Sequence, residues 1–385
     1  MQVPVAGECE SRFRAVREAF ERGFERHDEL GAAVSVVVDG RPVVDLWGGF
    51  RDGARTLAWE RDTLVNVWSI TKAVTAVCLA MLADRGQLDV DAPVAAYWPE
   101  FAAAGKQEIR VSCLLAHQAG LPALRAKLPA DSHLDWQVMT EALAQERPWW
   151  KPGTALGYHW FTWGWLAGEL LRRVDGRSVG AFIRAEIAEP LDLEFHLGTP
   201  PEIDARIAPI AGSDALVAWP VLLYWMRTPL RMPMRMCSLD NPHQSDAKVD
   251  SRAWRAAEIP AANGISNARA LARLFGVLAC ERDEGRSRLL GSAALERAIG
   301  MQADGRDLVF GYRSRFGLGF MLDSPSLGIA SGSRSFGHTG AGGGFAFADP
   351  DRGIGLAYTP NWRHPQSRLL VPQARNLIRA IYASL

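Results

Sequence analysis

The sequence predicts an α/β (α+β) fold: one antiparallel sheet built from both ends of the chain, flanked by terminal helices, with a helical domain between. Two runs rich in β-branched residues lie near the N-terminus, at 33–38 and 43–47, around an Asp39-Gly40 turn. Short apolar segments punctuated by glycine return after residue 300. Between these regions, apolar residues recur at helical spacing. We therefore expect a single sheet interrupted by a helical insertion.

The chain length predicts two domains. Its 385 residues exceed the roughly 250–300 at which a single hydrophobic core stops growing. We expect a discontinuous sheet domain formed by 1–65 and 301–385, and a mainly helical domain formed by 66–300. The active site is expected in the cleft between them.

The individual elements follow from periodicity and turn residues. Ser11 is expected to cap a first helix whose apolar face contains Phe13, Val16, Phe20 and Phe24. Further helices are predicted at 70–82, 160–174, 268–279 and 372–384, with Ser266 as a cap before the third of them. Strands are predicted at 317–322, 336–341, 344–349 and 354–359.

Composition excludes several classes of function. The 43 lysines and arginines balance 43 acidic residues, so no net charge attracts a nucleic acid or a membrane surface. Five cysteines, an odd number without C-x-x-C spacing, indicate a reduced cytoplasmic protein. No secretory signal is recognisable, and the longest apolar stretch, 215–226, is shorter than the ~20 residues of a membrane span. Metal-ligand spacings and nucleotide-binding motifs are missing, so we expect no cofactor and no metal.

The first candidate for chemistry is Ser69, three residues before Lys72. At this spacing, the two side chains lie on one face of a helix, one turn apart. Ser69 would lie at the helix N-terminus, where free N–H groups favour a developing negative charge. Apolar residues follow Lys72, so desolvation would lower its pKa and leave a neutral amine able to take a proton from serine.

The lysine is also unusual in this composition. Only five of the 43 basic residues are lysines, and arginine could not serve as a base because it stays protonated in proteins. The alternative is that Ser69 is a helix cap and Lys72 a solvated side chain, since S-x-x-K also occurs by chance.

Two later motifs could complete a site. Tyr158 follows Pro152-Gly153 on a loop before an apolar helix, where its phenol could relay a proton beside an ammonium group. The run 336–344 contains His338-Thr339-Gly340 ahead of Ala341 and three more glycines, which would let a backbone N–H face an oxyanion. The alternatives are a packing tyrosine and a tight turn between edge strands.

In this order, the three motifs resemble the signature of the serine β-lactamase and penicillin-binding-protein superfamily: S-x-x-K, then Y-x-N or S-x-N, then K-T-G or H-T-G. The stretch 114–121 resembles the L-L-x-H-x-x-G-L of its class C-like branch, and the resemblance covers about residues 10–382. Within the superfamily, the chain most resembles the family VIII carboxylesterases, which have a class C β-lactamase fold and hydrolyse esters.

The resemblance implies roles for individual residues. Ser69 would be the nucleophile, and Lys72 and Tyr158 would share the role of base. The N–H groups of Ser69 and Ala341 would hold the oxyanion. Substrate contacts would come from His159, Trp160, His338, Thr339 and Gly340.

Two departures from the signature bear on the substrate. Trp160 stands where the motif has asparagine, and His338 stands where it has lysine. Both changes remove groups that β-lactamases use to hold the amide and carboxylate of their substrate. The resemblance therefore favours a serine carboxylesterase that takes a small-molecule, short-chain ester.

Other activities of this fold stay open: β-lactamase, D-amino-acid peptidase or amide hydrolase, and acyltransferase. An alternative from another class is a non-catalytic penicillin-binding-like scaffold. A Ser-His-Asp triad through His338 is possible in principle, but nothing favours it over the nearer Lys72. His117 is interpreted as a structural histidine.

One irregular segment could shape the pocket. Residues 218–237 contain two tryptophans, four methionines and three prolines. Such adaptable apolar side chains suit a loop over an acyl pocket, or a buried connection between helices.

Overall fold

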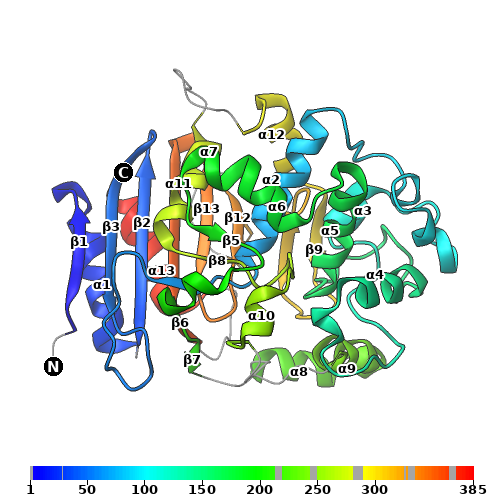
Figure 1. Cartoon of the computed structure of the whole chain (residues 1–385), viewed down its shortest axis with the longest axis horizontal. Coiled ribbons are helices and arrows are strands. Elements are labelled where there is room, and N and C mark those ends of the chain that lie inside the picture. Colours follow the sequence, from blue (N-terminus) through cyan, green and yellow to red (C-terminus); the bar gives the residue numbers. More distant parts are fainter. Residues whose placement is uncertain are drawn as a thin grey trace.

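A nine-stranded antiparallel sheet forms the centre of the computed structural model, which describes residues 3–27, 29–212, 219–242, 249–280, 289–324, 327, 334–363 and 370–385 (Figure 1). The strand order is β1-β3-β2-β14-β13-β12-β11-β10-β9. The strands are β1 (Val5–Cys9), β2 (Gly31–Val38), β3 (Arg41–Gly49), β9 (Ala303–Arg306), β10 (Arg313–Phe316), β11 (Met321–Leu322), β12 (Phe336–Thr339), β13 (Phe345–Asp349) and β14 (Ile354–Pro360). The predicted fold class is confirmed.

The two ends of the chain meet in the middle of this sheet. β2 pairs with β14 along its whole length, with Val34 opposite Tyr358. The predicted hairpin is β2 and β3, whose register shifts between Val36 and Val37. A sheet assembled from both termini therefore has its N-terminal and C-terminal strands as direct neighbours.

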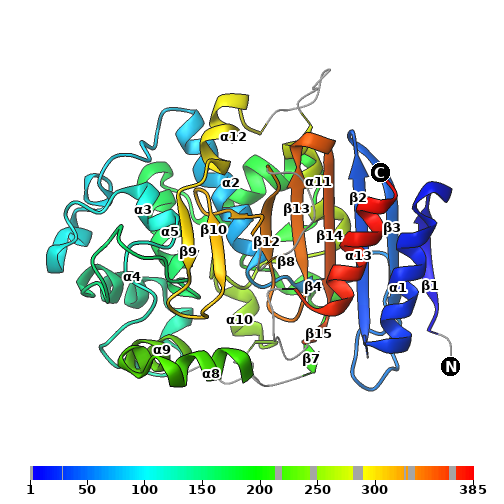
Figure 2. The same cartoon turned by 180° about the vertical axis from the view of Figure 1, so that it is seen from behind.

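Helices cover both faces of the sheet. On one face, the terminal helices α1 (Arg14–Arg26) and α13 (Pro372–Ala383) lie side by side (Figure 2). Their apolar side chains share one core with residues of β2, β13 and β14. On the other face, α11 (Ala268–Ala279) packs against β14, β2 and β13. The approach is very close: a methyl group on Gly355 would lie 2.1 Å from the nitrogen of Gly276.

Helix α2 (Ile70–Asp84) is buried from Ile70 to Leu82. A helix that is apolar all round belongs in a core, and α2 packs against α5, α6, α12 and β12. The other helices are α3 (Val111–Leu115), α4 (Trp136–Gln145), α5 (Thr162–Asp175), α6 (Val179–Ile183), α7 (Glu189–Leu191), α8 (Trp219–Arg227), α9 (Met232–Asp240), α10 (Arg252–Ala256) and α12 (Ser292–Ile299).

Two small sheets join distant segments of the chain outside the central sheet. One has the order β5-β8-β4-β6, from β5 (Phe195–His196), β8 (Ile265–Ser266), β4 (Leu64–Asn66) and β6 (Ile207–Ala208). The other pairs β15 (Trp362–Arg363) with β7 (Ala211–Gly212). In the described residues, no helix combines the length and the apolar composition needed to cross a membrane.

Several local predictions need correction. Ser11 does not cap α1: it begins a short 3-10 turn, Ser11–Phe13, and the helix starts at Arg14. Asn267, not Ser266, caps α11 by accepting a hydrogen bond from the Ala270 N–H, while Ser266 lies in β8 and donates to the Glu194 carbonyl. The strand predicted at 317–322 shortens to β11 because the chain turns back between Gly317 and Phe320.

Candidate active site

Ser69 lies directly before the first residue of α2, at the end of a short connection from β4. Its backbone is helical, and its hydroxyl makes no capping hydrogen bond, so the helix-cap alternative does not hold. The preceding residue, Trp68, has a positive φ of 52°. Such a conformation costs a bulky residue roughly 1–2 kcal/mol and is typical of functional sites. The Thr71 hydroxyl stabilises it by donating to the Trp68 carbonyl at 2.6 Å.

Lys72 points back toward Ser69, one turn earlier. Its Nζ lies 3.1 Å from Ser69 Oγ and donates to the Ala261 carbonyl at 2.9 Å. The side chain is 0% exposed, and it forms no ion pair with any described residue. Burial therefore lowers the pKa of Lys72 well below its usual value. A neutral amine here can accept the proton of the serine hydroxyl.

Tyr158 lies beside the amine end of Lys72. Lys72 Nζ lies 4.9 Å from the centroid of its ring. Burial raises the pKa of Tyr158, and the neighbouring Ser69 hydroxyl acts in the opposite direction. The phenol is therefore protonated at neutral pH.

His338 lies next to the phenol and is buried. Its Nδ1 lies 2.6 Å from the Thr339 carbonyl and must carry a proton to make this hydrogen bond. Burial lowers the pKa of His338 to about 3, so the ring is neutral and Nε2 has a free lone pair. That nitrogen lies 3.4 Å from the Tyr158 hydroxyl, which can donate to it. The predicted histidine therefore contacts the tyrosine.

Asp307 fixes the main chain of Tyr158. One carboxylate oxygen, Oδ2, accepts from the Tyr158 N–H at 2.6 Å. The other, Oδ1, accepts from the N–H groups of Val309 at 2.8 Å and Phe310 at 2.7 Å. The carboxyl is buried, and this burial raises its pKa to about 6. Sequence reasoning missed Asp307: an aspartate before a turn is a common signal, and its partner lies 149 residues away.

His159 is also buried, but its ring is fully used within the protein. Its Nδ1 donates to the Gly157 carbonyl at 2.7 Å, and Nε2 accepts from the Leu121 N–H at 2.9 Å. Its own N–H donates to Nδ1 of His117 at 3.0 Å. His117 and His159 therefore support the loop that carries Tyr158, and both ring nitrogens of His159 have hydrogen-bond partners within the protein.

The turn after β12 lies against the connection that carries Ser69. A methyl group on Gly340 would come within 2.8 Å of the Val67 carbonyl oxygen, so only glycine allows this approach. The turn is held by the Gly340 N–H, which donates to the Gly344 carbonyl at 2.7 Å. The predicted oxyanion groups, the N–H groups of Ser69 and Ala341, donate to no other residue among those described. Thr339 is buried beside Met321.

Aromatic side chains form a wall beside Tyr158. Trp160 meets Phe310 edge-on, with ring centroids 5.3 Å apart, and stacks on Phe161 at 5.8 Å. Phe310 in turn lies 5.8 Å from the Tyr158 ring. All three wall residues, Trp160, Phe161 and Phe310, are half-buried. We call them the aromatic wall.

The irregular segment expected at 218–237 forms α8, a short turn and α9; Ala218 lies outside the described residues. Its inner side binds the turn that follows Asp307. The Trp225 indole N–H donates to the Val309 carbonyl at 2.6 Å, and the buried Arg235 guanidinium donates to the Leu308 carbonyl at 2.8 and 3.1 Å. The segment is therefore attached to the same turn that carries Phe310.

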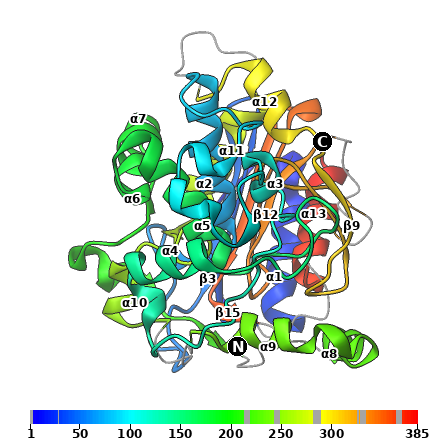
Figure 3. The same ribbon diagram turned by 90° about the vertical axis from the view of Figure 1, so that its right-hand side faces the viewer.

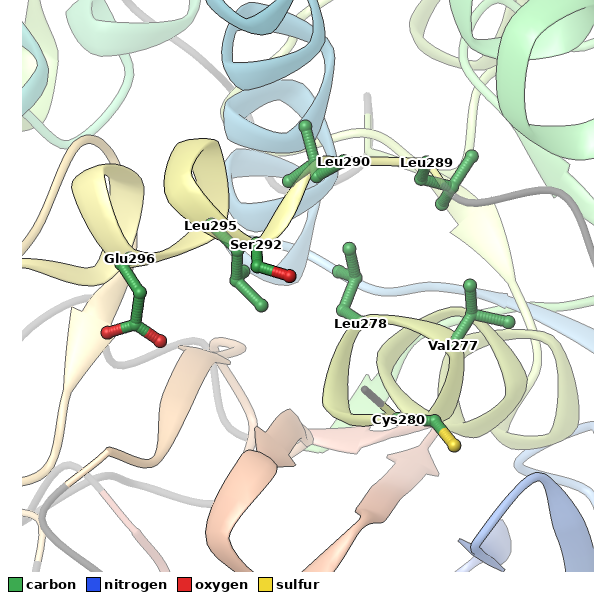
Figure 4. A pocket seen from close by; sticks show the side chains of 8 residues that line it. All are labelled: Val277, Leu278, Cys280, Leu289, Leu290, Ser292, Leu295 and Glu296. Atoms are coloured by element: carbon green, nitrogen blue, oxygen red, sulfur yellow. The ribbon is translucent and has the colours of Figure 1, made fainter. Parts of the chain in front are cut away.

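Other concave or polar features lie away from these residues. A mainly apolar pocket between α11 and α12 contains no predicted site residue (Figure 4). Its lining is Val277, Leu278, Cys280, Leu289, Leu290, Ser292, Leu295 and Glu296. Over the residues that the structure describes, no group of three or more His, Cys, Asp or Glu side chains is arranged to hold a metal ion.

The family follows from a match that spans almost the whole chain. Residues 16–380 match the model of the family described as beta-lactamase. The chain belongs to the beta-lactamase family. It is 37% identical to the "Esterase/beta-lactamase LipL" of Mycobacterium tuberculosis over 377 residues, which cover 96% of this chain and 84% of that protein.

Solved structures of the same fold agree along the whole chain. A crystal structure described as a family VIII carboxylesterase has a TM-score of 0.90 and 35% identity, covering 99% of this chain and 100% of that one. A penicillin-binding protein homologue from Caulobacter crescentus also has a TM-score of 0.90, with 38% identity and the same coverage of both chains.

Proposed function

We propose that this protein is a serine carboxylesterase that hydrolyses short-chain esters through an acyl-enzyme on Ser69. One observation carries the proposal: Lys72 Nζ lies 3.1 Å from Ser69 Oγ in a buried setting that lowers the pKa of the lysine. A neutral amine at hydrogen-bond distance from a serine hydroxyl is a nucleophile–base pair.

The reaction follows from this pair. Lys72 takes the Ser69 proton as Oγ bonds to the ester carbonyl carbon, and the oxyanion faces the N–H groups of Ser69 and Ala341. The carbon–oxygen bond to the alcohol then breaks, and the alcohol leaves with the proton held by Lys72, directly or through Tyr158. Water next attacks the acyl carbon and gives its proton to Lys72. The bond between the acyl carbon and Ser69 Oγ then breaks, Oγ takes that proton back, and the acid leaves.

The directions of the pKa shifts favour Lys72 over Tyr158 as the base. Burial lowers the pKa of the lysine, which makes its neutral form available, whereas it raises the pKa of the tyrosine, which keeps the phenol protonated. In this proposal Tyr158 is a hydrogen-bond donor and proton relay, and His338 accepts its hydrogen.

The aromatic wall favours an ester over a β-lactam. Trp160, Phe161 and Phe310 offer an apolar surface beside Tyr158, where β-lactamases need polar groups. The esterase half of the relative's name and the family VIII structure support the same choice. β-Lactam, D-amino-acid amide and acyl-transfer chemistry remain alternatives within the fold, and the complete set of Ser69, Lys72 and Tyr158 disfavours a non-catalytic scaffold.

The proposal keeps the cytoplasm as the expected compartment. The five cysteines, all within the described residues, form no disulfide, and Cys78 is buried in α2. Cysteines without disulfides are typical of a reducing compartment.

Two measurements on one preparation test the function. A fluorophosphonate probe should label Ser69 and should not label a Ser69→Ala variant. The kcat/KM for a butyrate ester should exceed that for a chromogenic cephalosporin. A cephalosporin value equal to or above the ester value would contradict the esterase proposal and support a β-lactamase, whereas no labelling and no turnover would support the scaffold.

A further inference from the structure

The exposed apolar side chains of this protein are concentrated on one segment. Six large apolar residues are exposed in the described chain, and four of them lie within fifteen positions: Leu222 (37% exposed), Met226 (51%), Leu230 (97%) and Met236 (52%). They belong to α8, to the turn Pro229–Arg231 and to α9. Figures 1 and 3 both place α8 and α9 along one edge of the molecule. We call these four side chains, together with α8, the turn Pro229–Arg231 and α9, the α8–α9 surface.

Exposed cations lie on and around the α8–α9 surface. Arg227 and Arg231 are exposed between its apolar residues, and the acidic residue that follows them along the segment is Asp240, at the end of α9. The exposed Arg306 lies 5.1 Å from the ring of Tyr224 on α8. Lys127 is exposed in the loop whose carbonyls bind Asn241, just after α9. None of these four cations forms an ion pair with a described residue, so their charge is not neutralised there.

A hollow beside α8 contains Arg306, one of these four cations, and Arg313, which pairs with Asp304. It is lined by Gly305, Arg306, Gly311, Tyr312 and Arg313. Arg306 uses its Nε to donate to the Gly311 carbonyl at 3.0 Å, which leaves its terminal nitrogens available. A methyl group on Gly311 would come within 2.5 Å of the Tyr224 ring, so the hollow directly adjoins α8.

We propose that the α8–α9 surface docks the protein on an anionic lipid surface. Leucine and methionine side chains would enter the boundary between headgroups and acyl chains, and the arginines would meet the lipid phosphates, as in interfacial amphipathic segments. A second copy of the chain is a poorer occupant, because a symmetric contact would bring the same cations together. The zero net charge of the chain predicted no membrane-surface partner, but a net charge does not show that exposed cations gather at this segment.

Docking would bring the lipid surface close to the active site. Trp225 and Arg235, on the inner side of the segment, bind the turn Leu308–Phe310, and Phe310 belongs to the aromatic wall. The outer side of the same segment would rest on the lipid. The proposal concerns binding, so it stands independently of the proposed esterase activity.

The test is co-sedimentation of the full chain with vesicles of phosphatidylcholine, alone or with 30% phosphatidylglycerol. We expect binding only to the anionic vesicles and at least a tenfold weaker affinity at 0.5 M salt, because screening removes the charge attraction. The double variants Met226→Asp/Leu230→Asp and Arg227→Gln/Arg231→Gln should each weaken binding at least tenfold. Turnover of a soluble ester should be unchanged in both, which reports on folding.

The chain offers matched controls. Leu57 and Met301 are exposed apolar residues elsewhere, 50% and 61% exposed, and a Leu57→Asp/Met301→Asp variant should bind like the wild type. Arg41→Gln/Arg110→Gln removes two exposed arginines outside the surface and should also have no effect. No binding to anionic vesicles, or equal losses in test and control variants, would overturn the proposal. Dimerisation that Leu230→Asp abolishes would also overturn it, in favour of a second copy as the occupant.

Discussion

The proposed catalytic centre and the aromatic wall differ in how deeply they are buried. Ser69 directly precedes a helix that is buried over thirteen consecutive residues, and Lys72 and His338 are buried as well. The aromatic wall is only half-buried, and the segment behind it exposes four large apolar side chains. The proposed reacting groups are thus held by core packing, whereas the side chains proposed to select a substrate lie where they can change without disturbing the core. Changes at the centre should therefore affect turnover, and changes at the wall should affect preference.

The largest effect is expected from Ser69→Ala. Without the nucleophile, kcat/KM for a butyrate ester should fall by roughly 10⁴-fold or more. The free energy of unfolding should change by less than about 1 kcal/mol, because the hydroxyl caps nothing. Steady-state kinetics and urea denaturation check both halves, and near wild-type turnover in a folded variant would disprove the assignment.

Lys72→Arg should be nearly as damaging as Lys72→Ala, with roughly a 10²–10⁴-fold loss of kcat for each. Arginine keeps the positive charge but cannot release a proton, so it removes the base. In the wild type, kcat should rise with pH through a pKa well below that of an ordinary lysine, because burial lowers it. Lys106→Arg, at the other fully buried lysine among the described residues, is the control. Substantial activity in Lys72→Arg would mean that Lys72 acts only through its charge.

Asp307→Asn tests whether the position of Tyr158 matters. The amide oxygen can replace Oδ1 at the Val309 and Phe310 N–H groups, but the NH₂ group would then face the Tyr158 N–H and lose that hydrogen bond. We expect kcat to fall by about ten- to a hundredfold with little change in KM, because a small misplacement of a proton relay is costly. The exposed Asp304→Asn variant should retain wild-type kinetics. An unchanged kcat in Asp307→Asn would contradict the positioning role.

The same variant has a predicted stability signature. Burial raises the pKa of Asp307 to about 6, above the unfolded value, so the native state binds more protons between about pH 4 and 6. This carboxyl therefore favours folding below that range, and the contribution is lost as pH rises to 6. Relative to Asp307→Asn, the wild type should lose roughly 1–3 kcal/mol of unfolding free energy over this interval. Chemical denaturation at pH 4, 5 and 6 measures the difference, and parallel curves would contradict it.

The smallest effect is expected at the wall. Trp160→Ala should lower the butyrate-to-acetate ratio of kcat/KM by about three- to tenfold, since each buried CH₂ is worth about 0.8 kcal/mol. Activity on acetate should stay within about threefold of the wild type. Trp149→Ala removes another half-buried indole, which packs on Arg125, and serves as the control. A uniform loss on both esters would show that Trp160 supports the centre instead of the acyl chain.

Sequence reasoning was strongest where the relevant residues are close in the chain. Ser69 and Lys72 lie one helical turn apart, and a one-turn spacing on an apolar helix is visible in any sequence. The class of fold was also accessible, because strand-like and helical periodicities separate cleanly along the chain.

It was weakest where a contact joins distant segments. Three features depend on tertiary packing that no local pattern encodes. They are the hydrogen bond from Tyr158 to Asp307, the hydrogen bond from Trp225 to Val309 and the positive φ of Trp68. The exposure of the apolar side chains on α8 and α9 was equally invisible in the sequence. The composition of that segment suggested a pocket, and only its orientation shows which residues face outward.

The pairing of β2 with β14 also has a consequence for biosynthesis. Gly31 and Asn361, which are hydrogen-bonded beside this pair, are separated by 330 residues. A ribosome adding residues at about 5–20 per second needs on the order of 20–60 seconds between making the first and the second. During that interval the apolar edge of β2, which pairs with β14 in the folded protein, has no strand to pair with. Nascent chains of this protein should therefore depend on chaperones more than their length alone would suggest.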